Sequence, residues 1–373
     1  MFIVDKFTKD LIEPLVIGGC ILGGGGGGSM KSGREFAELA FKLGTPSFIQ
    51  LDELKDDRGV VVTVSGVGAP AAKNQYVEPV DYLKAIELLE STSGVRPVAL
   101  MTNENGGAAT VNGLLQSAVM GIPILDAACN GRAHPTGIMG SMGLTELEDY
   151  EAIHVGVGGK QGTAARVEMV VKGNIQSCSK MIRQAAVQAG GLVTVARNPV
   201  SIEYIKANGA IHAISHAVEV GLANTRGTTP AEKIANVVSV LGGEIINEGT
   251  VRSFELTTID GFDVGKFIIE TAEKSTYDLT FWNEYMSVDN QHGERLTTFP
   301  DLIMTFSAMT GLPVTSAELA EGDQIVVITA PYQNLRLGGG MFTAKNYEII
   351  EQVLNIKILP YIESLVGSTI PAR

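Results

Sequence analysis

The chain has 373 residues, which exceeds the usual size of one hydrophobic core and favours two domains. Its formal net charge of −13 argues against a nucleic-acid partner, because nucleic-acid-binding surfaces need clustered Lys and Arg. Its three cysteines are too few for a disulfide framework, so we expect a reducing, cytoplasmic location.

The N-terminal stretch MFIVDKFTKD carries acidic residues early and lacks a basic region followed by an apolar core, so no signal peptide is expected. No uncharged run reaches the roughly 20 predominantly apolar residues of a membrane span, so we expect no membrane association. Helices are predicted over residues 8–22 and 32–43, where apolar residues recur at helical spacing.

Six consecutive glycines, residues 23–28, separate these two helices. Glycine accepts positive φ and lets backbone amides approach a ligand, and Ser29 is a suitable N-cap for the helix that follows. Unpaired N–H groups at such a point favour an anionic or carbonyl-bearing ligand. A flexible surface linker is the alternative interpretation. The glycines expected to contact the ligand are Gly24, Gly25, Gly26 and Gly27.

Apolar strands then alternate with helices, which predicts βαβ units and a largely parallel sheet. The strands are expected within residues 47–54, 59–70, 97–107 and 122–129, and the helices over residues 79–90 and 108–120. Loops that follow parallel strands line the ligand crevice of such folds. Three loops qualify, at residues 65–70, 103–107 and 126–135. From the first two we expect Gly68, Asn103, Gly106 and Gly107 to contact substrate.

Chemically active residue types crowd the third loop. Asp126, Cys129, Arg132 and His134 lie within nine residues and, with Glu104, could supply a base, a nucleophile and a charge stabiliser. These five are therefore the candidate catalytic residues. The alternative is that Asp126 caps the next turn, Arg132 pairs with it and Cys129 is simply buried.

Residues 152–173 predict two strands around a glycine turn, and helices are expected over residues 179–188, 199–208 and 211–222. His212 and His216 have the i, i+4 spacing of metal ligands, but HAISH lacks the Glu of HExxH. They are metal candidates only if further ligands come from elsewhere in the fold; a structural role is the alternative. No other cofactor is predicted.

From about residue 240 the sequence pattern changes to short β-prone runs with close turns, which favours an antiparallel sheet or a partly open barrel. The expected fold is α/β: an N-terminal α/β domain over residues 1–238 with a largely parallel sheet, and a smaller β-rich, barrel-like domain over residues 239–335. Residues 336–373, helical or mixed, could pack back on the first domain.

Several short motifs together resemble the S-methyl thiohydantoin desulfurase family, which is associated with hydantoinases and oxoprolinases. They are ILGGGGGG (21–28), GVGAP (66–70), ENGG (104–107), GIPILDA and GRAHP (121–135), FWNEY (281–285) and PDLI (300–303). The resemblance implies an α/β domain followed by a barrel-like domain, and hydrolytic removal of a sulfur substituent from a thiohydantoin ring to give a hydantoin. The chain departs from the family pattern after Asp126 and at His134, which leaves another ring open as the substrate.

The leading hypothesis is a hydrolase acting on a hydantoin-like or thiohydantoin-like five-membered ring, with a small molecule as its partner. Asp126 or Glu104 would activate water, Arg132 or His134 would assist the leaving group, and glycine amides would stabilise negative charge. The alternative is a non-catalytic subunit of a hydantoinase-type assembly that binds a small molecule or a nucleotide. The slight apolar surplus favours a homo-oligomer.

Overall fold

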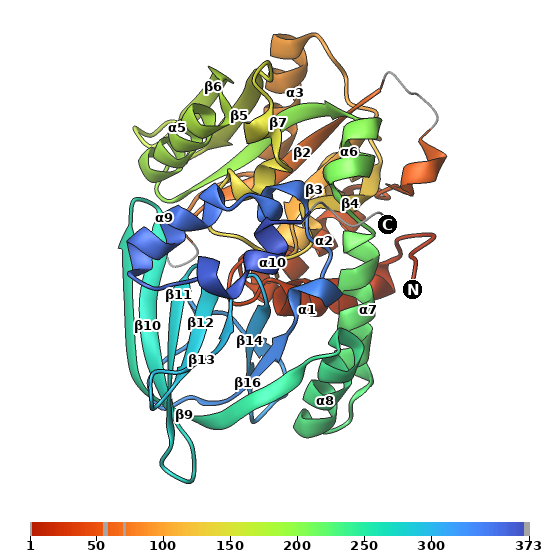
Figure 1. Cartoon of the computed structure of the whole chain (residues 1–373). Coiled ribbons are helices and arrows are strands. Elements are labelled where there is room, and N and C mark those ends of the chain that lie inside the picture. The colour runs from red at the N-terminus through yellow and green to blue at the C-terminus, as the bar shows by residue number, and fades with distance from the viewer. Residues whose placement is uncertain (1, 55–58, 70–71, 369–373) are drawn as a thin grey trace.

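The computed structural model describes residues 2–54, 59–69 and 72–368, which form two packed sheets with their helices (Figure 1). The helices are α1 (Ile12–Leu22), α2 (Met30–Leu43), α3 (Pro79–Ser93), α4 (Leu114–Met120), α5 (Ile175–Gln188), α6 (Ile202–Asn208), α7 (Ala213–Arg226), α8 (Pro230–Leu241), α9 (Lys345–Leu354) and α10 (Glu363–Val366). The first sheet contains β1 (Phe48–Ile49), β2 (Val60–Gly68), β3 (Ala99–Glu104), β4 (Ile124–Asn130), β5 (Ala152–Gly158), β6 (Val167–Gly173), β7 (Leu192–Ser201) and β8 (Ala210–Ile211). The second contains β9 (Glu244–Ile259), β10 (Phe262–Glu270), β11 (Thr276–Trp282), β12 (Glu284–Asn290), β13 (Arg295–Thr298), β14 (Leu302–Ser307), β15 (Pro313–Val314) and β16 (Gln324–Ala330).

The first sheet has the order β1-β4-β3-β2-β7-β5-β6, and the short strand β8 pairs antiparallel with residues 127 and 128 of β4. Strands β1, β4, β3 and β2 are parallel, with Val61 opposite Ala99 and Leu100 opposite Ile124. β2 to β4 are buried almost throughout, as their continuous apolar runs require when helices cover both faces. The predicted α/β domain with parallel strands is therefore confirmed, and antiparallel β7, β5 and β6 extend it.

Strand β7 was not among the predicted strands. A helix was expected over residues 199–208, but Pro199 lies within β7, and α6 begins only at Ile202. The side chain of Ser201 caps that helix by accepting a hydrogen bond from the Tyr204 amide at 3.2 Å. The β-branched residues Val193 and Val195 precede this point and are fully buried. Their preference for strand structure favours β7, which continues through Pro199.

Helix α1 is apolar and buried at every position except Glu13 in its first turn. It packs closely on α7, because a Cβ on Gly18 would overlap the Ala217 carbonyl and one on Gly221 would overlap the Pro14 carbonyl. A helix that is hydrophobic all round belongs to the interior of the protein. No helix in the described part of the chain is long and apolar enough to cross a membrane.

The second sheet has the order β13-β12-β11-β10-β9-β16-β14-β15, and every neighbouring pair is antiparallel. The expected antiparallel β-rich domain is confirmed; within the described ranges the sheet stays open and does not close into a barrel. Phe254, Phe267, Phe281 and Tyr285 form an aromatic cluster on it, with ring centroids 5.8 to 6.3 Å apart.

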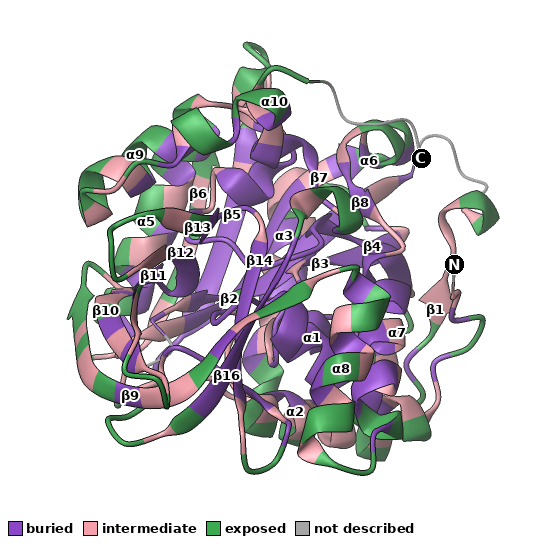
Figure 2. Cartoon of the chain, turned by 60° about the horizontal axis from the view of Figure 1, so that its bottom comes forward, coloured by how far each residue is buried: buried purple, intermediate pink, exposed green. Residues whose placement is uncertain are grey.

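Most buried residues of the first sheet form apolar clusters of their own. Helix α1 and the second sheet share one apolar core, which reaches the first sheet at Ile124 of β4. Its buried residues include Leu15 and Ile21 of α1 together with Phe267, Tyr285 and Ile303 of the second sheet. Figure 2 shows this continuous buried layer, with α1 among the strands. The loop that follows α1, residues 23–28, therefore lies where the two sheets meet.

Candidate active site

The glycine loop joins the two halves of the molecule through its carbonyl groups. The Tyr285 amide donates to the Gly24 carbonyl at 2.7 Å, and the Ser316 amide donates to the Gly25 carbonyl at 2.9 Å. On the other side, Ala108 and Ala109 donate to the Gly27 carbonyl at 3.0 and 2.9 Å. The loop is thus an ordered connection and not a flexible surface linker.

Three of the glycines make room for side chains from elsewhere in the fold. A Cβ on Gly24 would lie 2.5 Å from the Arg132 guanidinium, and one on Gly25 would lie 2.8 Å from the Tyr285 ring. A Cβ on Gly26 would overlap the carboxyl group of Glu284.

Of the glycines predicted to touch substrate, only some reach the cavity described below. Gly27 and Gly68 line it, whereas Gly24, Gly25 and Gly26 lie buried beneath it. Gly106 and Gly107 also lie outside its wall, where they pack against Gly27 and against the Gly28 carbonyl respectively.

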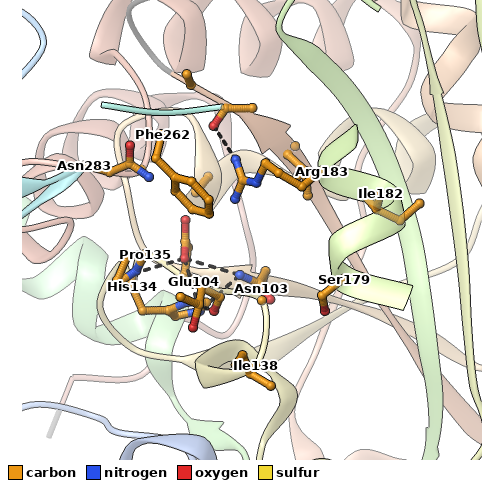
Figure 3. A pocket seen from close by; sticks show the side chains of 18 of the residues that line it. Asn103, Glu104, His134, Pro135, Ile138, Ser179, Ile182, Arg183, Phe262 and Asn283 are labelled. Atoms are coloured by element: carbon orange, nitrogen blue, oxygen red, sulfur yellow. Dashed lines mark hydrogen bonds and ion pairs between the residues drawn. The ribbon is translucent and has the colours of Figure 1, made fainter. Parts of the chain in front are cut away.

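A cavity of about 1590 Å3 lies between the two sheets. The three loops expected to line a crevice all border it, through Gly68, through Asn103 and Glu104, and through His134. Pro70, at the end of the first of these loops, is outside the described residues. Figure 3 shows Asn103, Glu104 and His134 on one side of this space, with Phe262 and Arg183 facing them across it.

Asn103, Glu104 and His134 form one hydrogen-bonded group. The Asn103 amide nitrogen lies 3.2 Å from both Glu104 Oε2 and His134 Nε2. Glu104 Oε2 is also 3.2 Å from His134 Nε2 and accepts from the His134 backbone amide at 3.3 Å. The Glu104 side chain is 16% exposed, toward the cavity, whereas that of His134 is 2% exposed. Glu104 is thus the member that can meet a ligand.

The neighbours of this group fix where its proton lies. Arg197 Nη2 donates to Asn103 Oδ1 at 2.6 Å, so the Asn103 amide group must face Glu104 and His134 as a donor. His134 Nδ1 donates to the Thr136 carbonyl at 2.9 Å, so the neutral imidazole leaves a lone pair on Nε2. The lone pair repels a carboxylate oxygen 3.2 Å away. A proton on Glu104 removes this repulsion, so the protonated carboxyl group is favoured beside the neutral imidazole.

The pKa values agree with this arrangement. Burial raises the pKa of Glu104 to about 7, against hydrogen bonding from His134 and the positive charge of Arg197. Burial and then the positive charge of Arg197 lower the pKa of His134 to about 3. Glu104 therefore changes its protonation state near neutral pH while His134 stays neutral, which is the property of a general acid or base.

Two arginines that the sequence did not single out border the same space. Arg197, on the unpredicted strand β7, is buried and holds Asn103 in place. Arg183, on α5, donates from Nη1 to the Gly68 carbonyl at 2.9 Å and to the Gly261 carbonyl at 3.0 Å. Its guanidinium carbon lies 4.0 Å from the centroid of the Phe262 ring.

The second sheet contributes Phe262, Trp282, Asn283 and Glu284 to the cavity wall. Glu284 is 2% exposed, and its Oε2 has no hydrogen-bond partner in the described part of the chain. Burial, and then the charge of Glu104, raise the pKa of Glu284 well above its ordinary range. The FWNEY motif was the sequence signal for this wall, although its Glu was not among the predicted catalytic residues.

Asp126 lies away from the cavity, on the other side of β4. Its Oδ1 accepts from the Ser215 amide at 2.9 Å, and its Oδ2 accepts from the Ser215 hydroxyl at 2.6 Å. His212 Nδ1 donates to Oδ2 at 3.2 Å. The carboxylate therefore satisfies the first turn of α7. The alternative weighed above had Asp126 cap the next turn of its own segment and pair with Arg132, and its partners here are His212 and Ser215 instead.

Cys129 and Arg132 are also directed away from the cavity. Burial raises the pKa of the Cys129 thiol to about 11, and Thr63 Oγ1 lies 3.2 Å from the sulfur. Arg132 Nη1 donates to the carbonyls of Pro300 and Asp301 at 2.9 and 2.6 Å, so its guanidinium ties the GRAHP segment to the PDLI segment. Neither residue lines the cavity.

The two metal candidates are not brought to a common site. His212 begins α7 with φ 61° and faces Asp126, and His216 lies one turn further along the helix. Across residues 2–54, 59–69 and 72–368, no three His, Cys, Asp or Glu side chains are grouped so that they could hold a metal ion.

The arrangement places a carboxyl group of pKa near 7 opposite an arginine, in a cavity large enough for a small organic molecule. Sequence reasoning found Glu104, His134 and Asn103, because they follow apolar strands. It missed Arg183, Arg197 and Phe262, which stand in no local motif and reach the cavity through long-range packing.

Comparison with known proteins adds the following findings. A family model described as "S-Me-THD-like, N-terminal domain" matches residues 10–166, and one described as "S-Me-THD-like, C-terminal domain" matches residues 173–336. No curated protein matches the chain. A crystal structure of a protein from Chromobacterium violaceum is similar, with a TM-score of 0.72 and 21% sequence identity over 99% of this chain and 100% of that chain. At that identity the similarity shows a shared fold alone.

Proposed function

Because the chain belongs to the S-Me-THD-like family, we propose that it is a hydrolase that removes a sulfur substituent from a thiohydantoin-like five-membered ring. The ring would lie in the cavity between the two sheets, with the carbon that bears sulfur next to Glu104. The products would be the corresponding hydantoin and a thiol.

The reaction would proceed by addition of water and loss of the thiol. The Glu104 carboxylate takes one proton from a water molecule as its oxygen bonds to the ring carbon. The carbon–sulfur bond then breaks, and Glu104 returns that proton to the departing sulfur. The second proton of the water moves to the ring nitrogen, which completes the hydantoin amide. One residue therefore acts first as base and then as acid.

Asn103 and the backbone of His134 would hold Glu104 in position for both steps. The Asn103 amide group and the His134 backbone amide both donate to Oε2, at 3.2 and 3.3 Å. The other carboxyl oxygen is left for water. The single observation that carries the proposal is a carboxyl group of pKa about 7 in the wall of a cavity of about 1590 Å3.

The test is turnover of an S-methyl thiohydantoin in water enriched in 18O. We expect release of methanethiol, detected with a thiol reagent, and hydantoin that carries one 18O atom. The matched control is Glu104→Gln, which keeps the shape of the side chain and should lose turnover while its thermal unfolding midpoint stays near that of the wild type.

Binding without turnover would contradict the proposal. In that outcome a thiohydantoin, a hydantoin or a nucleotide raises the unfolding midpoint of the wild-type protein and no thiol is released. The protein would then be the non-catalytic binding subunit considered from the sequence.

A further inference from the structure

Arg183 is a half-buried cation without an ion-pair partner among the described residues. Among the residues that the structure describes, no carboxylate lies within the 4.0 Å of a salt bridge to its guanidinium. Its hydrogen bonds go from Nη1 to two backbone carbonyls, those of Gly68 and Gly261. Taking a charge partly out of water is costly unless an opposite charge compensates it, so this position favours a ligand that brings negative charge.

The geometry holds the guanidinium still and points it into the cavity. One carbonyl comes from the end of β2 and the other from the turn between β9 and β10, so Nη1 is held from both sheets. The Phe262 ring stacks on the guanidinium at 4.0 Å from its centroid. Figure 3 shows the free end of the guanidinium directed toward the space above Glu104. A donor fixed in this way needs no reorganisation when a ligand enters.

The acids nearest to Arg183 do not neutralise it. Glu104 and Glu284 both act on Arg183 electrostatically, but burial raises the pKa of each of them, so Glu284 favours its neutral form and Glu104, with a pKa of about 7, is only partly ionised at neutral pH. Burial, and then the charge of Arg197, lower the pKa of Arg183 to about 10, which leaves it charged at neutral pH. Arg197, the other cation here, already donates from Nη2 to Asn103.

We propose that Arg183 is a further catalytic residue, which stabilises the negative charge that develops on the ring when water adds. This inference rests on the proposed function. Addition of water to the carbon that bears sulfur moves an electron pair onto the adjacent ring nitrogen, and conjugation spreads it to the ring carbonyl oxygen. Nη2 and Nε of Arg183 donate to that nitrogen–carbonyl edge while Glu104 works at the ring carbon.

This assignment gives the stabilising role to a side chain and not to the glycine loop. The carbonyls of Gly24, Gly25 and Gly27 accept hydrogen bonds from the protein, and Gly24 to Gly26 lie under the side chains of Arg132, Tyr285 and Glu284. The amides that the sequence suggested as charge stabilisers are therefore mostly behind the cavity wall.

The experiment compares Arg183→Ala with the wild type on an S-methyl thiohydantoin, with and without added guanidinium ion. We expect kcat to fall by about 10²–10³-fold, with a smaller change in KM, because the interaction strengthens in the transition state. Added guanidinium should raise the kcat of Arg183→Ala at least about tenfold, because it fills the space left by the side chain. Arg183→Lys should lie between the two, because it keeps the charge and loses the planar donor set.

Arg166→Ala is the matched control. Arg166 is also partly buried, but it pairs with Asp81 and Glu168 and lies outside the cavity wall. Its loss should leave kcat unchanged, and guanidinium should have no effect on the variant.

Two results would overturn the assignment alone. One is an active wild type with an equally active Arg183→Ala variant. The other is a loss of kcat that guanidinium leaves unchanged and that follows the fall in unfolding midpoint, as a purely structural tie would give. A wild-type protein without turnover would overturn the proposed function, and this assignment with it.

Discussion

The part of the chain that the structure describes contains two carboxyl–histidine pairs with the same separation and opposite surroundings. Glu104 Oε2 and His134 Nε2 are 3.2 Å apart, and so are Asp126 Oδ2 and His212 Nδ1. The first pair borders the large cavity, whereas the second is enclosed between β4 and the start of α7. The separation of an acid from a histidine therefore does not identify a catalytic site.

What distinguishes the pairs is the number of donors that the fold supplies to each carboxyl group. Asp126 accepts from an amide, a hydroxyl and an imidazole, so its charge is compensated within the protein. Glu104 accepts from the Asn103 amide group and the His134 backbone amide, both at Oε2, but that oxygen also faces the lone pair of a neutral imidazole, and the side chain is open to the cavity. A carboxyl group that the protein leaves incompletely satisfied is the one available to substrate.

The largest expected effect that tests this contrast is the loss of activity in Glu104→Gln. General acid–base catalysis contributes about 10²–10⁴-fold, so kcat/KM should fall by that factor. The unfolding midpoint should stay close to that of the wild type, because Gln keeps the shape and an acceptor for Asn103. Retained activity would remove Glu104 from the mechanism.

The second effect falls on stability. Asp126→Ala removes the cap of α7 and leaves the Ser215 amide without its acceptor. The cap and the unsatisfied donors together should cost about 2–4 kcal/mol of unfolding free energy in denaturant titrations. The folded fraction should keep its kcat/KM. A stable but inactive variant would reverse the roles assigned to the two pairs.

These two residues also show how far sequence reasoning reached. The pattern of apolar runs predicted the α/β fold and the three loops around the crevice, because parallel strands expose their C-terminal ends together. It ranked Asp126 beside Glu104, because residues 126–135 were taken as the loop after a strand. The strand expected within residues 122–129 already contained Asp126, and β4, which continues to Asn130, places Asp126 inside the sheet, where it faces α7.

The rest of the site could not be predicted from short stretches of sequence. Arg197 lies on β7, which was not predicted as a strand, and Arg183 reaches the cavity only because α5 packs beside the turn at Gly261. The six consecutive glycines singled out residues 23–28 as a candidate ligand-binding loop. Its role in accommodating Arg132, Tyr285 and Glu284 depends on contacts across more than a hundred residues of chain.

Gly26→Ala sharpens the contrast between the cavity wall and the layer behind it. The new Cβ would overlap the Glu284 carboxyl, so we expect about 1–3 kcal/mol of destabilisation, measured by thermal and denaturant unfolding. Gly66→Ala is the control, because its Cβ would meet only Leu192 Cδ1 at an ordinary 3.4 Å. Equal stability of the two variants would contradict the packing role of the loop.

Cys129→Ala should have the smallest effect. The thiol is buried and its pKa is raised to about 11, so it is a poor nucleophile, and kcat/KM should stay near the wild-type value. Loss of the sulfur should cost about 0.5–1.5 kcal/mol in stability. A large loss of turnover in a well-folded variant would instead point to covalent catalysis by Cys129.

The central claim is that Glu104, and not Asp126, carries the working proton. Its most direct test is the pH dependence of kcat/KM for the wild type, Asp126→Asn and Glu104→Gln. For the wild type and Asp126→Asn, kcat/KM should rise about tenfold per pH unit below pH 7 and level off above it, as Glu104 loses its proton. The residual kcat/KM of Glu104→Gln should not show this rise with pH. A rise that persists in Glu104→Gln and disappears in Asp126→Asn would contradict the account.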